Sequence, residues 1–152
     1  MCLFADTKRM KVAKEDITCY KRITFLFNNN EIKFVTPYQR TSVPIEVILG
    51  KQEFSAFGDL KAAKGEDGYK IFGGVIHAYV YEINALDNQH SDELVVACII
   101  PKGTMYIEGY DGWGNKVIAA QKIKVDAGFK NEEELKKAAV KVENWFKKMY
   151  GR

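Results

Sequence analysis

His77 and Tyr79 are the residues whose types and spacing most suggest chemistry. They stand two positions apart in residues 69–81, YKIFGGVIHAYVY, so a strand would place both side chains on one face. Gly73 and Gly74 precede them, and glycines inside a strand pattern are typical of a bulge or of a close approach by a ligand or another backbone. An imidazole beside a phenol can act as acid, base or ligand contact, so we predict a ligand-binding face here. The alternative is a half-buried histidine that a backbone carbonyl satisfies.

Cys2 is a second candidate for chemistry. Removal of Met1 would leave Cys2 with a free amine beside its thiol, and that amine can serve as the base for a thiol nucleophile. The sequence shows no oxyanion site for such a reaction. Cys19 and Cys98 lie in apolar stretches, so we interpret them as small core residues. The spacing of the three cysteines and two histidines matches no metal motif, and we predict neither a metal nor a cofactor.

Aromatic and cationic side chains stand together at residues 20–22 and 38–40, a combination that can hold a nucleotide or protect a strand edge. Tyr20 is the residue of this group that we include in the predicted ligand site. Residues 109–114, GYDGWG, lack the helix start of a phosphate cradle, so we interpret them as a turn. Tyr110 and Trp113 in this turn offer a stacking surface for a base or a peptide.

The second half of the chain predicts the centre of a sheet. Residues 95–100, VVACII, form an unbroken apolar run rich in β-branched side chains, which indicates a strand in the middle of a sheet. Residues 101–103, PKG, interrupt the run, and residues 104–110 resume as a strand. After the turn at residues 111–115, residues 117–125 alternate in polarity and predict a third strand that returns antiparallel.

Shorter elements are expected before this centre. Residues 17–27 and 31–36 predict a hairpin across the asparagines 28–30. Further predictions are a short strand at residues 44–49, one helical turn at residues 59–64 and a short helix or turn at residues 82–89.

Residues 131–150 predict the clearest helix of the chain. Asn131 is a favourable N-cap, and Glu134 completes a capping box. Apolar residues recur at helical spacing at Leu135, Ala138, Ala139, Val142, Trp145, Phe146 and Met149. We therefore predict one α+β domain over residues 1–152: an antiparallel, twisted sheet or partly open barrel of about six to eight strands, covered by this helix.

Composition limits the classes of partner. A chain of 152 residues suffices for one domain with a core of its own. The net charge of +3 comes from 23 basic and 20 acidic residues without a long run of one sign, so a nucleic-acid partner is not expected. No stretch has the length of a signal peptide or of a membrane span, and we predict a cytoplasmic protein without a membrane partner.

Several short motifs carry a family resemblance. With its MCL start, CYK (residues 19–21), VTPY (35–38), IHAY (76–79) and IPKGT (100–104), the chain resembles small uncharacterised proteins of phages and gut bacteria, a family without an assigned activity. The IPKGT element is also similar to one in ADP-ribosyltransferase folds. That likeness implies residues 20–22, His77 or Tyr79, and Glu108 as site residues, but the Ser-Thr-Ser and Glu-x-Glu elements of such enzymes are missing.

The leading functional prediction is a non-enzymatic domain that binds a small molecule, a nucleotide or a protein at the face of His77 and Tyr79. One alternative is an enzyme, which either has an ADP-ribosyltransferase-like fold and transfers from a nicotinamide nucleotide, or uses Cys2 as its nucleophile. Another is a homodimeric interaction module that associates through Trp113 and the C-terminal helix.

Overall fold

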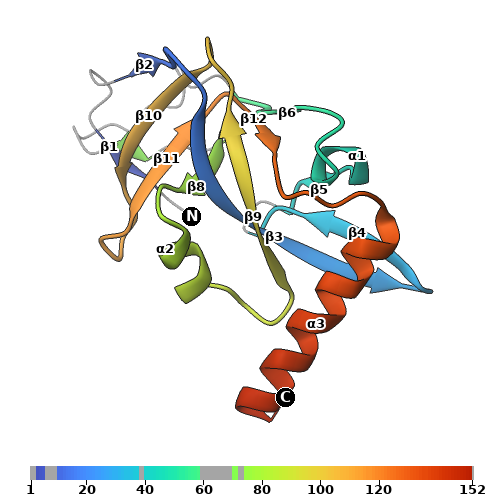
Figure 1. Cartoon of the computed structure of the whole chain (residues 1–152). Coiled ribbons are helices and arrows are strands. Elements are labelled where there is room, and N and C mark those ends of the chain that lie inside the picture. The colour runs from blue at the N-terminus through green and yellow to red at the C-terminus, as the bar shows by residue number, and fades with distance from the viewer. Residues whose placement is uncertain (1–2, 6–9, 38–39, 59–69, 72–73, 152) are drawn as a thin grey trace.

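The computed structural model describes residues 3–5, 10–37, 40–58, 70–71 and 74–151. These residues form an α+β fold in which one antiparallel sheet, not closed into a barrel, is accompanied by helices (Figure 1). The predicted fold class is therefore confirmed. The helix predicted at residues 59–64 lies outside the described residues.

The sheet contains 12 strands within the described part of the chain. The longer ones are β3 (Ile17–Asn28), β4 (Glu31–Val35), β8 (Ile76–Tyr79), β9 (Glu93–Ile100), β10 (Met105–Tyr110), β11 (Lys116–Ala120) and β12 (Lys122–Val125). Those of two residues are β1 (Phe4–Ala5), β2 (Lys11–Val12), β5 (Ser42–Val43), β6 (Phe54–Ser55) and β7 (Lys70–Ile71). The helices are α1 (Ile45–Ile48), α2 (Glu82–Asp87) and α3 (Glu132–Tyr150). The expected six to eight strands correspond to the longer group alone.

Strand β3 joins the two halves of the sheet, whose order is β6-β12-β9-β3-β8-β11-β10-β1-β7. It pairs with β9 over 8 positions, whereas its described register with β8 is the single pair Tyr20↔Tyr79. We call this short β3–β8 pairing the seam. One face of the sheet carries the larger core, with Cys19, Ile23 and buried residues of α1 and α3. The other face carries a smaller core with Tyr79, Leu3 and Ala85 of α2.

Several predicted elements are confirmed. β9 lies between β12 and β3, as expected for a strand in the middle of the sheet. β3 and β4 form the predicted hairpin, in which Asn29 and Asn30 adopt left-handed φ angles of 50° and 68°. The turn between β10 and β11 is held by Asp111, whose carboxylate accepts hydrogen bonds from the backbone N–H groups of Trp113 and Asn115.

The predicted strand that returns antiparallel is confirmed as β11, but it does not continue as one strand to residue 125, because the chain changes neighbours at Gln121. Before this residue β11 pairs with β10 and β8, and after it β12 pairs with β9 and β6. The Gln121 side chain donates a hydrogen bond of 2.6 Å to the carbonyl oxygen of Gly58, and its backbone N–H donates to Met105. Alternating polarity continues across the break, so the pattern alone does not reveal it.

The short strand predicted at residues 44–49 is wrong, because residues 45–48 form helix α1. Pro44, with φ −59°, precedes the helix, and its carbonyl oxygen accepts the N–H of Val47. Val47 and Ile48 are buried in the larger core. Gly50 follows at φ +76°, and a Cβ atom there would lie 2.7 Å from the carbonyl oxygen of Val125. A run this short does not distinguish a strand from one buried helical turn.

Helix α3 begins and ends as predicted. The Asn131 side chain accepts the N–H of Glu134 at 3.0 Å. The Glu134 carboxylate accepts the N–H of Lys130 at 2.9 Å, one residue earlier than in a standard capping box. Gly151 closes the helix with φ 68°, and its N–H donates to the carbonyl oxygen of Lys147. The described residues 82–87 also confirm the predicted short helix, as α2.

Only the first half of α3 covers the sheet. Leu135 and Ala139 are fully buried, but Trp145 and Met149 are 51% and 57% exposed. In Figure 1 the second half of this helix extends past the strands toward the C-terminus. The prediction that the whole apolar stripe is buried on the sheet therefore needs correction. We call residues 143–150 of α3 the overhang, because Val142 still packs against the larger core.

Candidate functional site

The structure brings three of the predicted site residues to one face of the sheet. Tyr20 on β3 stands directly opposite Tyr79 on β8. His77 lies two positions before Tyr79 on the same strand, so its side chain leaves the sheet on the same side. The strand period of two therefore puts His77 and Tyr79 on one face, as the sequence predicts, and Tyr20 lies beside them on β3.

This face is buried, whereas the predicted ligand-binding face would have to be accessible to a ligand. His77 is 6% exposed and Tyr79 is 2% exposed, and Tyr79 packs in the smaller core with Leu3 and Ala85. Because α2 contributes Ala85 to that core, a ligand cannot reach these side chains unless surrounding residues move. The alternation of a strand shows which residues share a face, but it does not show whether a helix covers that face.

A second backbone approaches the glycine break. Gly74 has a left-handed φ of 73°, and its carbonyl oxygen accepts the N–H of Gly58 at 2.7 Å. A Cβ atom on Gly58 would lie 3.0 Å from the same oxygen. Of the two possibilities that the sequence left open, a ligand or another backbone, the described residues show the backbone. Gly73 and Cys2, two other predicted site residues, lie outside them.

Arg22 and Glu93 form a buried ion pair beside Tyr79, which the sequence analysis did not predict. Their side chains are 3% exposed each, and Arg22 Nη1 lies 3.1 Å from Glu93 Oε1. The same nitrogen donates to the carbonyl oxygen of Asn88 at 2.8 Å, and Glu93 Oε1 also accepts the N–H of His90. The Arg22 guanidinium stands 5.7 Å from the centre of the Tyr79 ring. Each charge therefore has several compensating contacts.

Lys21 is buried on the opposite face of β3, inside the larger core. It is 7% exposed, and its Nζ atom donates a hydrogen bond of 2.8 Å to the backbone carbonyl oxygen of His77. Burial lowers the pKa of this amine to about 8, and the neighbouring Arg22 also lowers it, whereas Cys98 and Cys19 oppose the change. An amine with such a pKa is partly neutral near physiological pH. Its burial was not predicted.

Cys19 and Cys98 stand directly opposite each other on β3 and β9. Both are 0% exposed and belong to the larger core, so the interpretation as core residues is confirmed. Burial raises the pKa of the Cys19 thiol to about 12, against an opposing effect of Lys21. Burial also raises the pKa of the Cys98 thiol, and the neighbouring Cys19 adds a smaller increase. Both residues are free thiols.

Glu108 is not assembled with His77. Cross-strand neighbours connect Glu108 to Ile118 on β11 and Ile118 to Ala78 on β8, so Glu108 leaves the sheet on the side opposite to His77. Its carboxylate instead lies 3.4 Å from Lys116 Nζ at the surface and raises the pKa of that lysine. The geometry therefore does not build the site implied by the ADP-ribosyltransferase likeness.

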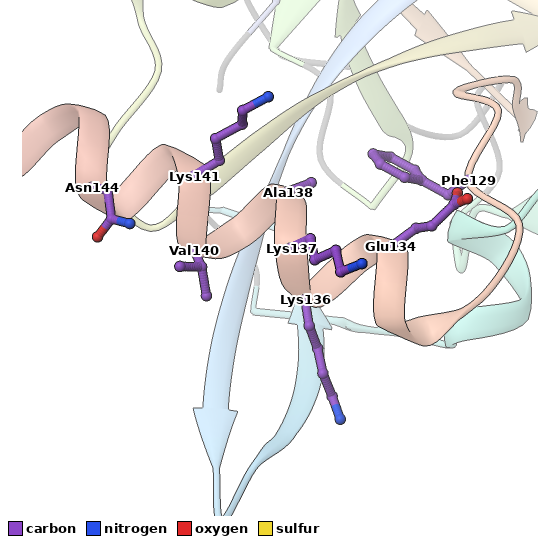
Figure 2. A pocket seen from close by; sticks show the side chains of 8 residues that line it. All are labelled: Phe129, Glu134, Lys136, Lys137, Ala138, Val140, Lys141 and Asn144. Atoms are coloured by element: carbon purple, nitrogen blue, oxygen red, sulfur yellow. The ribbon is translucent and has the colours of Figure 1, made fainter.

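A shallow depression follows the exposed side of α3 (Figure 2). In Figure 2, Lys136 and Val140 extend to one side of the helix, whereas Lys141 extends to the other. The depression therefore runs over the surface of the helix and does not enter the molecule. Its lining is Phe129, Glu134, Lys136, Lys137, Ala138, Val140, Lys141 and Asn144.

Comparisons add no external assignment. No family model, no curated protein and no solved structure matches this chain. Within the described residues, no three His, Cys, Asp or Glu side chains gather as ligands for a metal ion. In the same part of the chain, no helix is both long and apolar enough to cross a membrane.

Proposed function

We propose that this protein is a non-enzymatic binding domain that associates with a second copy of itself through the overhang of α3. One observation carries the proposal: the apolar stripe of α3, buried where it meets the sheet, continues along the overhang without cover. Trp145, Met149 and Tyr150 are 51%, 57% and 64% exposed. An uncovered cluster of large apolar side chains is typical of an interaction surface.

The overhang presents aromatic rings that already contact one another. The Trp145 and Phe146 ring centres are 4.9 Å apart in an edge-to-face arrangement, and those of Phe146 and Tyr150 are 5.7 Å apart. Rings held in this way lose little conformational freedom when a partner binds. Tryptophan and tyrosine are also the residues that most often dominate the energy of protein interfaces.

The distribution of charge along α3 favours a second copy as the partner. Within the overhang, Glu143 precedes Trp145, and Lys147 and Lys148 follow it. Two copies related by a two-fold axis can pack their overhangs antiparallel around Trp145, so Glu143 of one copy lies toward Lys147 of the other. Opposite charges then meet on both sides of the apolar contact, which sets the antiparallel direction of the pairing.

The other predicted functions have less support from the geometry. His77 and Tyr79 are buried, and Glu108 leaves the opposite side of the sheet, so the candidates for ligand binding and catalysis are not gathered in an open site. The depression along α3 follows the helix surface and offers a small molecule little enclosure. A flat, exposed apolar surface instead suits another protein surface.

Sedimentation velocity over a wide range of protein concentrations tests this proposal. We expect the mass to rise to that of a dimer, and we expect the double substitution Trp145→Ser with Met149→Ser to keep the chain monomeric. Trp113→Ser is the matched control, because Trp113 is 88% exposed and belongs to the β10–β11 turn, which Figure 1 shows away from α3. A wild-type chain that stays monomeric at every concentration would refute the proposal. Equal loss of dimer in the control would move the interface to the turn.

A further inference from the structure

Cys19 and Cys98 are positioned so that a disulfide between them needs no movement of the backbone. They are register partners in the antiparallel pairing of β3 and β9, so both side chains leave the sheet on the same face. Cα atoms of directly opposed residues in such a ladder are about 4.5–5.5 Å apart. Disulfides span Cα distances of about 4.4–6.8 Å, so the pair falls within the permitted range.

Lys21 places an amine on the same face, two residues from Cys19. Its Nζ atom is fixed by the hydrogen bond to the carbonyl oxygen of His77. Its positive charge lowers the pKa of both thiols, but the effect of burial is larger, so both pKa values stay raised and both residues are protonated thiols at neutral pH.

We propose that Cys19 and Cys98 form an oxidation site that closes to a disulfide between β3 and β9 when the protein meets a hydroperoxide. The sulfur of one thiol attacks the peroxide. An S–O bond forms, the O–O bond breaks, and the departing hydroxide takes up the proton of that thiol and leaves as water. The second sulfur then displaces hydroxide from the sulfenic acid, which forms the S–S bond and releases a second water. The two sulfurs together lose the two electrons that reduce the peroxide.

Burial limits the oxidant to a small molecule. Both cysteines are 0% exposed, so a bulky disulfide such as oxidised glutathione cannot approach either sulfur in the native fold. Hydrogen peroxide is not much larger than water and needs only a small opening of the core. Formation of the disulfide would fix the 8-position pairing of β3 with β9, on which both halves of the sheet depend.

The test treats the native protein with hydrogen peroxide, blocks remaining thiols after denaturation, and identifies the products by mass spectrometry. A Cys2→Ser background restricts the readout to the buried pair. We expect one cross-linked peptide pair, Cys19 with Cys98, and we expect no such pair after treatment with oxidised glutathione. Cys98→Ser should stop at a Cys19 sulfenic acid that a dione reagent traps. Two alkylated thiols after peroxide, or separate sulfinic acids without a cross-link, would overturn the proposal.

Discussion

The Nζ atom of Lys21 donates a hydrogen bond of 2.8 Å to the backbone carbonyl oxygen of His77, across the seam between β3 and β8. The next residue, Arg22, reaches the same strand from the other face, with its guanidinium 5.7 Å from the centre of the Tyr79 ring. Two consecutive cationic residues, Lys21 and Arg22, therefore contact β8 at the seam from opposite faces of the sheet. Because the described register of this seam is a single pair, these side-chain contacts supplement a short backbone ladder.

The first prediction concerns the cost of burying Lys21. The lowering of its pKa from 10.5 to about 8 corresponds to a cost of about 3 kcal/mol for the charged amine in the folded state. Lys21→Met removes that cost but also loses a hydrogen bond worth about 1 kcal/mol. We therefore expect the free energy of unfolding at neutral pH to rise by about 1–2 kcal/mol, measured by urea denaturation. A large loss of stability would show that the hydrogen bond across the seam outweighs the cost of burial.

The second prediction is the pH dependence of this effect. Between pH 8 and 10.5 the unfolded chain holds the Lys21 proton more tightly than the folded chain, so this group's contribution to stability rises with pH. The advantage of Lys21→Met should be largest below pH 8 and shrink above it. Cys19 acts in the opposite direction, because its pKa rises from 9.0 to about 12, and its contribution is lost as pH increases above 9. Urea denaturation of the wild type and of Lys21→Met between pH 7 and 9 separates the effect of the lysine from that of Cys19. A pH-independent difference would contradict the assignment.

The third prediction concerns the Arg22–Glu93 pair. Glu93→Ala leaves a buried guanidinium without its carboxylate, so we expect a loss of about 3–5 kcal/mol in the free energy of unfolding. Replacing both residues, as Arg22→Met with Glu93→Leu, should recover most of that loss, because no buried charge remains. Glu53→Ala at the surface pair with Lys122 is the control, with an expected loss below about 1 kcal/mol. Additive losses in the double variant would show that the two side chains do not interact.

These contacts also show how far the sequence predicts the structure. Local patterns predicted the β3–β4 hairpin, the position of β9 and both ends of α3, because each depends on neighbouring residues. A strand period of two predicted that His77 and Tyr79 share one side of the sheet. The burial of these two side chains could not be predicted in this way, since it depends on α2 and on Leu3, which lies far from them in sequence. Lys21 and Glu93 carry no local signal of burial either, because charged residues are usually exposed.

The fourth prediction uses two glycines of the β10–β11 hairpin. A Cβ atom at Gly109 would overlap the carbonyl oxygen of Phe4 and lie 2.8 Å from the Cβ of Ala5, so β1 and β10 could not keep their spacing. Gly109→Ala should lower the free energy of unfolding by about 1–3 kcal/mol. Gly112→Ala is the matched control, since no atom lies within 4 Å of its Cβ position. Equal effects of the two substitutions would show that chain entropy, and not the contact with β1, decides the result.

The fifth prediction connects the start of α3 with the proposed association. Asn131→Ala removes the acceptor of the 3.0 Å hydrogen bond from the Glu134 N–H, which should cost about 1 kcal/mol. Asn131→Asp keeps an acceptor and adds a negative charge at the positive end of the helix dipole, so its stability should match the wild type. Leu135 and Ala139 anchor α3 on the sheet within two turns of this cap, and fraying there loosens the base from which the overhang extends. We therefore expect Asn131→Ala, but not Asn131→Asp, to weaken the dimer severalfold in sedimentation equilibrium. If Asn131→Ala lowers stability while the dimer is unaffected, then the overhang associates independently of how its helix is anchored.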